Sequence, residues 1–235
     1  VADRRIRCHK TTGHGTQTFT QTVMNSCNPA FIEWGRRVGV DNFYTYIDKL
    51  GLTSKTGIDI AGEAGTIIHK KENVGEVELA TMSFGQSFQI TPMQMLRAAA
   101  AIVNGGNLVT PHFAIRTCAA DKTTYSEFSY STTQEAVSKE TSDTMKDILR
   151  QVVEEGGGKN AYIEGFSIGG KTATSQKLPR GSGKYIASFI GFSDVTDPSV
   201  IAMCLIDEPQ GVYYGGTIAA PVIRELYDNI LPYMD

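Results

Sequence analysis

The sequence predicts an α+β fold in which helices pack against an antiparallel sheet. Two observations carry this prediction. Helical patterns dominate the first part of the chain, and consecutive apolar strand patterns follow at 166–176, 185–192 and 200–206. A closing amphipathic helix is expected from about Ile218. Strands that follow one another directly in sequence pair antiparallel, and the flanking helices then cover the sheet.

The composition indicates a globular protein and excludes several functional classes. With 235 residues, 41% hydrophobic and 20% charged, the chain can bury one sizeable core. A net charge of −3 and the lack of a basic run argue against a nucleic-acid partner. The longest apolar run, 98–103, is too short to span a bilayer. Because the chain begins at Val1, we expect it to be a segment of a longer protein.

Cap signals mark the helices of the first part. A short helix is expected within 16–25, and Asn28 is the predicted N-cap of the next helix, with Pro29 in its first turn. A third helix is expected over 40–50. Thr91, Pro92 and Gln94 form the clearest start, a capping box that opens an alanine-rich helix.

A polar stretch and a further capped helix follow in the second part of the chain. Ser138 caps a further amphipathic helix, and the Thr-, Ser- and Tyr-rich stretch 107–137 before it predicts exposed strands or a hairpin.

The cysteines and histidines give no metal signature. Neither the four cysteines nor the four histidines show C-x-x-C or H-E-x-x-H spacing, so no metal site is expected. Cys204 lies in an apolar strand pattern and is predicted to be a buried thiol. A disulfide among Cys8, Cys27 and Cys118 remains open.

The stretch 169–176 is the strongest candidate for a functional strand. Its β-branched residues favour an extended chain, and alternation places Thr172, Thr174 and Gln176 on one face. Lys171 and Ala173 then lie on the other face. Hydroxyls at every second position beside a cation could bind a carboxylate. The alternative interpretation is an ordinary edge strand whose lysine guards against aggregation.

Several motifs together carry a resemblance to a known family. Ser26-Cys27-Asn28 resembles the S-x-N box, and Lys171-Thr172-Ala173-Thr174 the K-T-G box, of penicillin-binding proteins and serine β-lactamases. Further segments resemble the class B high-molecular-weight transpeptidases, in particular the stage V sporulation protein D and cell-division group. These segments are Gly13-His14-Gly15-Thr16, Lys55-Thr56-Gly57-Ile58-Asp59, Phe84-Gly85-Gln86, Ile90-Thr91-Pro92-Met93-Gln94, Asn104-Gly105-Gly106, Tyr214-Gly215-Gly216 and Ala219-Ala220-Pro221. The resemblance covers nearly the whole chain.

The resemblance implies a peptidoglycan D,D-transpeptidase that crosslinks stem peptides by serine acyl transfer. Ser26 and Lys171 would form a proton relay, and Asn28 would orient the substrate amide. Thr172 and Thr174 would hold the terminal carboxylate, with the Thr174 N–H as half of the oxyanion hole. Ala173 and Gln176 complete the implied substrate-binding strand, and the resemblance implies no metal or organic cofactor.

The same resemblance implies partners and a location. The expected ligands are stem peptides ending in D-Ala-D-Ala and β-lactam antibiotics, with division or sporulation wall-synthesis proteins as further candidate partners. A membrane-anchored parent would act on the extracytoplasmic face of the bacterial cell membrane.

Two departures from the family pattern bear on activity. Ala173 stands where the family usually has Gly, and no lysine in the chain has a serine three residues before it. The nucleophilic serine of the S-x-x-K motif is therefore expected before Val1, so that 1–235 would be the C-terminal portion of a single transpeptidase domain. The literal Lys55-Thr56-Gly57 follows Ser26 too closely to be the functional box and is assigned a structural role.

Two other functions remain open. A catalytically inactive module of the same fold could bind stem peptide or a division partner, and Ala173 favours that alternative. A β-lactam sensor or β-lactamase is the second alternative, against which the class B segments argue.

Overall fold

The computed structural model describes residues 1–3, 5–179 and 181–234. Its helices are α1 (Phe19–Met24), α2 (Asn28–Lys49), α3 (Glu76–Ser83), α4 (Pro92–Val103), α5 (Lys139–Glu154), α6 (Gly215–Ile218) and α7 (Ala220–Ile230). Its strands are β1 (Leu108–Val109), β2 (Arg116–Cys118), β3 (Tyr125–Glu127), β4 (Thr132–Thr133), β5 (Ile168–Gln176), β6 (Tyr185–Ser193) and β7 (Val200–Asp207). Short 3₁₀ turns lie at Lys71–Asn73, Lys159–Ala161 and Leu231–Tyr233.

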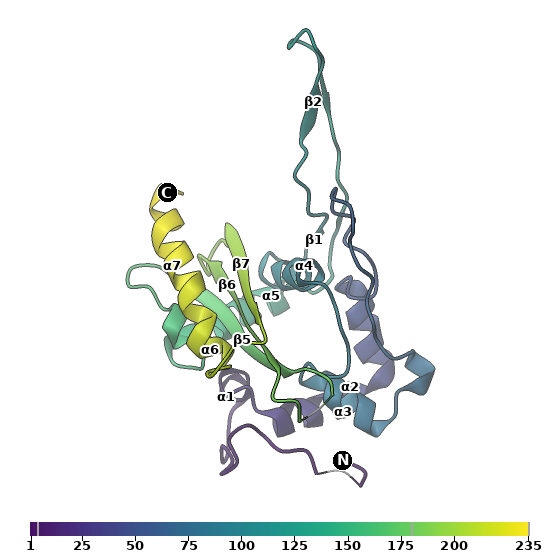
Figure 1. The fold of residues 1–235 in the computed structure, drawn as a ribbon, viewed down its shortest axis with the longest axis vertical. Helices are drawn as coiled ribbons and strands as arrows, with labels where there is room; N and C mark the ends of the chain where they lie inside the picture. The colour runs from purple at the N-terminus through teal and green to yellow at the C-terminus, as the bar shows by residue number, and fades with distance from the viewer. Residues whose placement is uncertain (4, 180, 235) are drawn as a thin grey trace.

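The main sheet is antiparallel with the order β5-β6-β7, so β5 is an edge strand. Lys171 on β5 pairs with Ile190 on β6, and Phe189 on β6 pairs with Cys204 on β7. Figure 1 shows α7 lying across the sheet, with α1 near one end of β5. Helices packed on an antiparallel sheet confirm the predicted α+β class, and the predicted strand patterns form this sheet.

The main core lies between this sheet and the helices α5 and α7. Phe189 from β6 is fully buried there, together with Val153 of α5 and Ile223 of α7. Tyr227 of α7 is also fully buried, and its hydroxyl donates a hydrogen bond of 2.6 Å to the carbonyl of Gly191. Burial raises the pKa of the Tyr227 phenol, so the hydroxyl stays neutral and α7 is held to β6 by a satisfied polar contact.

Replacing Tyr227 with Phe should lower stability. The change leaves the buried carbonyl of Gly191 without this donor, which costs about 1–2 kcal/mol. Chemical denaturation with a two-state fit measures the loss. Tyr233→Phe is the matched control, because Tyr233 is 88% exposed and should change nothing. Equal stability of the two variants would contradict a structural role for the Tyr227 hydroxyl.

The start of α2 differs by one residue from the prediction. Cys27, not Asn28, is the N-cap, and Asn28 and Pro29 occupy the first helical positions. The predicted helix over 40–50 is the second half of α2, which continues through a break at Gly39. Gly39 has φ +76°, a left-handed conformation that glycine adopts at little cost, so the two halves change direction without separating.

The remaining predicted starts and strands are confirmed. Thr91 caps α4 through the predicted capping box with Gln94, and Ser138 caps α5. Gln94 is fully buried. Its side-chain amide also donates hydrogen bonds to the Ser54 carbonyl and to Thr66 Oγ1, at 2.7 and 2.8 Å, and these bonds offset the cost of burying a polar group.

The stretch 107–137 forms the predicted hairpin. Strands β2 and β3 pair antiparallel, and the hairpin projects well away from the rest of the molecule (Figure 1). None of the described helices has the length and apolar character needed to cross a lipid bilayer.

Candidate active site

Lys171 on the edge strand β5 lies against the turn that follows α1. Its Nζ donates to Ser26 Oγ at 3.1 Å and to the carbonyl of Thr172 at 2.9 Å. Ser26 has φ +48°, which is uncommon for a residue other than glycine. Backbone hydrogen bonds from Ser26 to Val23 and from Cys27 to Thr22 hold this turn, at 3.1 and 3.0 Å. Strained conformations of this kind cluster at functional sites.

Burial makes the Lys171 amine easier to deprotonate. Desolvation lowers its pKa from 10.5 to about 8. No ion pair to Lys171 occurs among the described residues, so no carboxylate offsets this effect. An amine with a pKa near neutral pH can both accept and donate a proton, so Lys171 and Ser26 form a pair suited to proton transfer.

The lowered pKa predicts a pH-dependent stability difference between the natural chain and Lys171→Met. Below about pH 8 folding buries a charged amine, and that cost is fully present. Between about pH 8 and 10.5 the unfolded chain binds more protons than the folded chain, so the natural chain gains stability as the pH rises. Relative to Lys171→Met, that gain should reach about 3 kcal/mol, since one unit of pKa corresponds to about 1.4 kcal/mol.

Denaturation midpoints of both chains across this pH range measure the effect. Lys55→Met is the matched control, because Lys55 is exposed and its replacement removes the same side chain without touching the Ser26–Lys171 pair. A flat difference between the natural chain and Lys171→Met would contradict the depressed pKa of Lys171.

Thr172 and Thr174 share one face of β5, as the alternation predicts. The Thr174 Oγ1 accepts a hydrogen bond of 3.2 Å from the backbone N–H of Gly215. Thr172 lies against Gly157 and Gly216, where an added Cβ would come within 3.7 and 3.2 Å of its side chain. The start of α6 therefore covers this face.

The close approach of α6 to β5 requires glycine. A Cβ on Gly215 would lie 2.2 Å from the carbonyl oxygen of Ser188 and 2.4 Å from that of Ala173. Gly215 and Gly216 therefore allow the helix to sit directly on the strand that carries the threonines.

The Ala173 side chain is exposed. The alternation places it on the Lys171 face of β5, away from the two threonines. No described element covers that part of this face, so the methyl group of Ala173 displaces nothing in this structure.

The other predicted site residues, Asn28 and Gln176, make no hydrogen bond to Ser26 or Lys171 among the described residues. The Asn28 amide donates to the carbonyl of Arg7 at 3.3 Å. Gln176 is partly buried at the end of β5, and no described side chain hydrogen-bonds to it. Their proposed roles toward substrate stay predictions.

Two residues near the site, Gln86 and His9, were not among the site residues predicted from the sequence. Gln86 Nε2 donates to Ser175 Oγ at 3.4 Å, which brings the Phe84-Gly85-Gln86 segment to the Lys171 face of β5. His9 lies close enough to Lys171 to respond to its charge. Burial is the largest cause of the lowered pKa of His9, followed by the positive charges of His14, Lys171 and Lys10. Gln86 lies in a motif of the resemblance, whereas nothing in the sequence pointed to His9.

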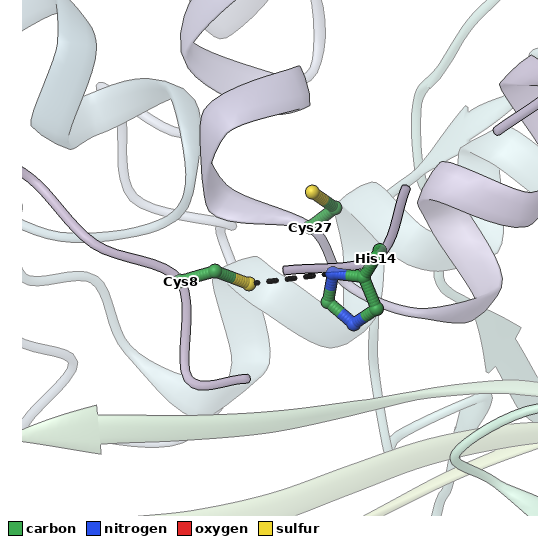
Figure 2. Close-up of side chains that lie close together, drawn as sticks. All are labelled: Cys8, His14 and Cys27. Atoms are coloured by element: carbon green, nitrogen blue, oxygen red, sulfur yellow. Dashed lines mark hydrogen bonds between the residues drawn. The ribbon is translucent and has the colours of Figure 1, made fainter. Parts of the chain in front are cut away.

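The structure also brings Cys8, His14 and Cys27 together beside this turn (Figure 2). Their ligand atoms all lie within 4.8 Å of one another, and Cys8 Sγ is 3.7 Å from His14 Nδ1. All four cysteines are free, so no disulfide of the kind left open forms here. Cys204 is only partly buried, although burial raises the pKa of its thiol.

The literal Lys55-Thr56-Gly57 has the structural environment assigned to it. The Glu63 carboxylate accepts from the backbone N–H groups of Thr56 and Gly57 at 2.7 and 3.3 Å. Lys55 itself is exposed and makes no hydrogen bond or ion pair among the described residues. The loop is thus closed by an acidic side chain, not arranged around a lysine.

The chain is similar to known proteins over most of its length. Stage V sporulation protein D of Bacillus subtilis is 42% identical over 99% of this chain and 37% of its own length. The probable peptidoglycan D,D-transpeptidase PenA of Neisseria meningitidis is 30% identical over 89% of this chain and 35% of its own length. The chain therefore spans little more than a third of these relatives.

Solved structures show the same fold. Penicillin binding protein 3 from Mycobacterium tuberculosis, complexed with aztreonam, matches with a TM-score of 0.84 and 26% identity, over 92% of this chain and 51% of that one. The family model of the penicillin binding protein transpeptidase domain matches residues 1–228. The chain belongs to the penicillin binding protein transpeptidase family.

Proposed function

We propose that this chain supplies the S-x-N and K-T-G-like boxes of a peptidoglycan D,D-transpeptidase that crosslinks stem peptides by serine acyl transfer. The observation that carries the proposal is the contact of 3.1 Å between Lys171 Nζ and Ser26 Oγ. It joins the two boxes, which lie far apart in the sequence, in one proton-transfer pair. The names of the relatives, D,D-transpeptidase and penicillin-binding protein, support the same activity.

The pair fits the proton transfers that acyl transfer needs. A serine from an S-x-x-K segment attacks the penultimate D-Ala carbonyl, and the terminal D-Ala leaves as an amine that must gain a proton. Ser26 Oγ can pass a proton to that nitrogen and recover one from Lys171, whose pKa of about 8 allows the exchange. The acyl group then passes to an amine of a neighbouring stem peptide.

Thr172 and Thr174 are suited to binding the substrate carboxylate. Because Thr174 Oγ1 accepts from Gly215, its own hydroxyl proton remains available for a carboxylate. Thr172 lies on the same face of β5, and Gln176 extends it toward the end of the strand. In this proposal the Thr174 N–H supplies one oxyanion donor, and Asn28 orients the substrate amide.

The setting of the reaction belongs to the same proposal. Residues 1–235 would form part of one transpeptidase domain, in a membrane-anchored protein at the extracytoplasmic face of the bacterial membrane. Its ligands would be D-Ala-D-Ala stem peptides and β-lactam antibiotics, as the aztreonam and ampicillin complexes of penicillin binding protein 3 from Mycobacterium tuberculosis suggest. Division or sporulation wall-synthesis proteins would be its partners, in keeping with the name of the Bacillus relative.

One observation favours a second function, an inactive stem-peptide binding module. Ala173 replaces the usual Gly of the box. Since its side chain is exposed, it could narrow the path of a substrate along β5 instead of displacing the strand. The two functions differ in whether the site is acylated.

The test uses a longer protein that joins an S-x-x-K segment of the family to residues 1–235, labelled with a fluorescent penicillin. We expect a stable label, and we expect Ala173→Gly to change the acylation rate by less than about tenfold, since one methyl in an open position is a small obstacle. If the Gly variant is labelled and the natural protein is not, the inactive module is the correct function. Turnover of the penicillin without retained label would indicate a β-lactamase.

A further inference from the structure

We propose that Cys8, His14 and Cys27 form a binding site for a thiophilic divalent cation, Zn²⁺ being the best match. The proposal does not depend on the transpeptidase function. It contradicts the expectation from sequence that no metal site is present, because the three residues come together only in the folded chain.

The distances approach those of a tetrahedral zinc site. With Zn–S bonds of about 2.3 Å and Zn–N bonds of about 2.0–2.1 Å, neighbouring ligand atoms lie about 3.5–3.8 Å apart. Cys8 Sγ and His14 Nδ1 are already 3.7 Å apart, and all three ligand atoms lie within 4.8 Å of one another. Figure 2 shows the Cys8 sulfur and the His14 ring facing each other, with Cys27 beside them.

The donor set selects the cation. Two thiolates and one imidazole suit Zn²⁺, and the two thiolate charges would balance the charge of the cation. His9 offers a fourth nitrogen, since its Nδ1 lies 3.5 Å from Cys8 Sγ and its ring centroid 5.4 Å from that of His14. A small movement of the loop would bring His9 into the coordination sphere.

Cys27 is held in place by the start of a helix, whereas Cys8 and His14 lie in a loop that can shift toward a bound cation. Cys27 is buried at the N-cap of α2, and its N–H donates a hydrogen bond of 3.0 Å to the carbonyl of Thr22. His14 lies between Gly13 and Gly15, whose φ angles are +80° and +68°. A bound cation would therefore tie the loop of residues 8–14 to the turn that carries Ser26.

The experiment titrates the reduced chain of residues 1–235, after metal is removed with a chelator, with Co²⁺ and then Zn²⁺. We expect one ion per chain and near-ultraviolet thiolate-to-cobalt absorption, with release of protons on binding. Cys8→Ser and His14→Ala should each weaken binding by about tenfold to a hundredfold or more.

Matched controls come from the same chain. Cys118→Ser and His112→Ala should bind like the natural chain, because both residues are exposed and lie outside the cluster. Circular dichroism checks that each variant is folded, and Cys8 and His14 lie in a loop without regular structure, so their replacement should preserve the fold. The proposal fails if the reduced chain binds no stoichiometric metal, or if Cys8→Ser and His14→Ala bind as tightly as the two controls. Loss of binding when Cys8 and Cys27 are oxidised to a disulfide would support thiolate ligation.

Discussion

Incubated with excess benzylpenicillin, the chain of residues 1–235 should gain no mass. Covalent capture of a β-lactam needs an activated serine and an oxyanion hole in one place. No lysine of this sequence has a serine three residues before it, so the nucleophile motif of the family is missing from the chain. Intact-mass spectrometry after incubation measures the result.

Ser26 is the residue of this chain that most resembles an activated nucleophile. Its Oγ lies 3.1 Å from Lys171 Nζ, and a Ser–Lys pair can act as a nucleophile with its base. We expect it not to do so here, because Thr174 would supply only one oxyanion donor. Loss of one such donor costs roughly a hundredfold to a thousandfold in rate.

The Ser26→Ala variant of residues 1–235 is the control for this result. A stoichiometric mass gain in the natural chain that disappears in Ser26→Ala would make Ser26 the nucleophile. The relay assigned to Ser26 and Lys171 would then be wrong. A gain that persists in Ser26→Ala would point to another nucleophile and leave the relay intact.

Local chemistry explains why so much of the fold was predictable from sequence. Thr91 and Gln94 satisfy the start of α4 by themselves, so the signal lies within four consecutive residues. The alternation along β5 likewise fixes which residues share a face, and Thr172 and Thr174 do so. The N-cap of α2 was misplaced by one residue because Asn28 is a better capping residue than Cys27, while Pro29 fits either of the first helical positions.

Tertiary contacts explain what the sequence could not supply. The exposure of Ala173 depends on which elements cover each face of β5, and alternation alone does not say that. Cys8, His14 and Cys27 have no regular spacing, and they meet because the loop before α1 returns to the N-cap of α2. The contact between Lys171 and Ser26 was reachable from sequence only through the resemblance of the two boxes.

Replacing Lys171 should have the largest effect on the proposed reaction. In a longer protein that joins an S-x-x-K segment to residues 1–235, we expect Lys171→Met to lower the rate of penicillin acylation by roughly a thousandfold, since a positioned acid–base group contributes about 10²–10⁴. Ser26→Ala should lower it less, because Lys171 can still reach the leaving nitrogen through water. Stopped-flow or gel-based labelling with a fluorescent penicillin measures both rates.

A pH profile separates the proton relay from a purely structural role for Lys171. The relay needs the protonated amine, so acylation in the natural protein should decline as pH rises through about 8. Lys171→Arg retains the charge but removes this titration, because a guanidinium stays protonated far above that pH. We therefore expect a slower enzyme whose decline near pH 8 is absent. If Lys171→Arg keeps the decline near pH 8, another group titrates there and Lys171 is not the proton donor. If Lys171→Met acylates within about tenfold of the natural protein, the contact with Ser26 has no catalytic part.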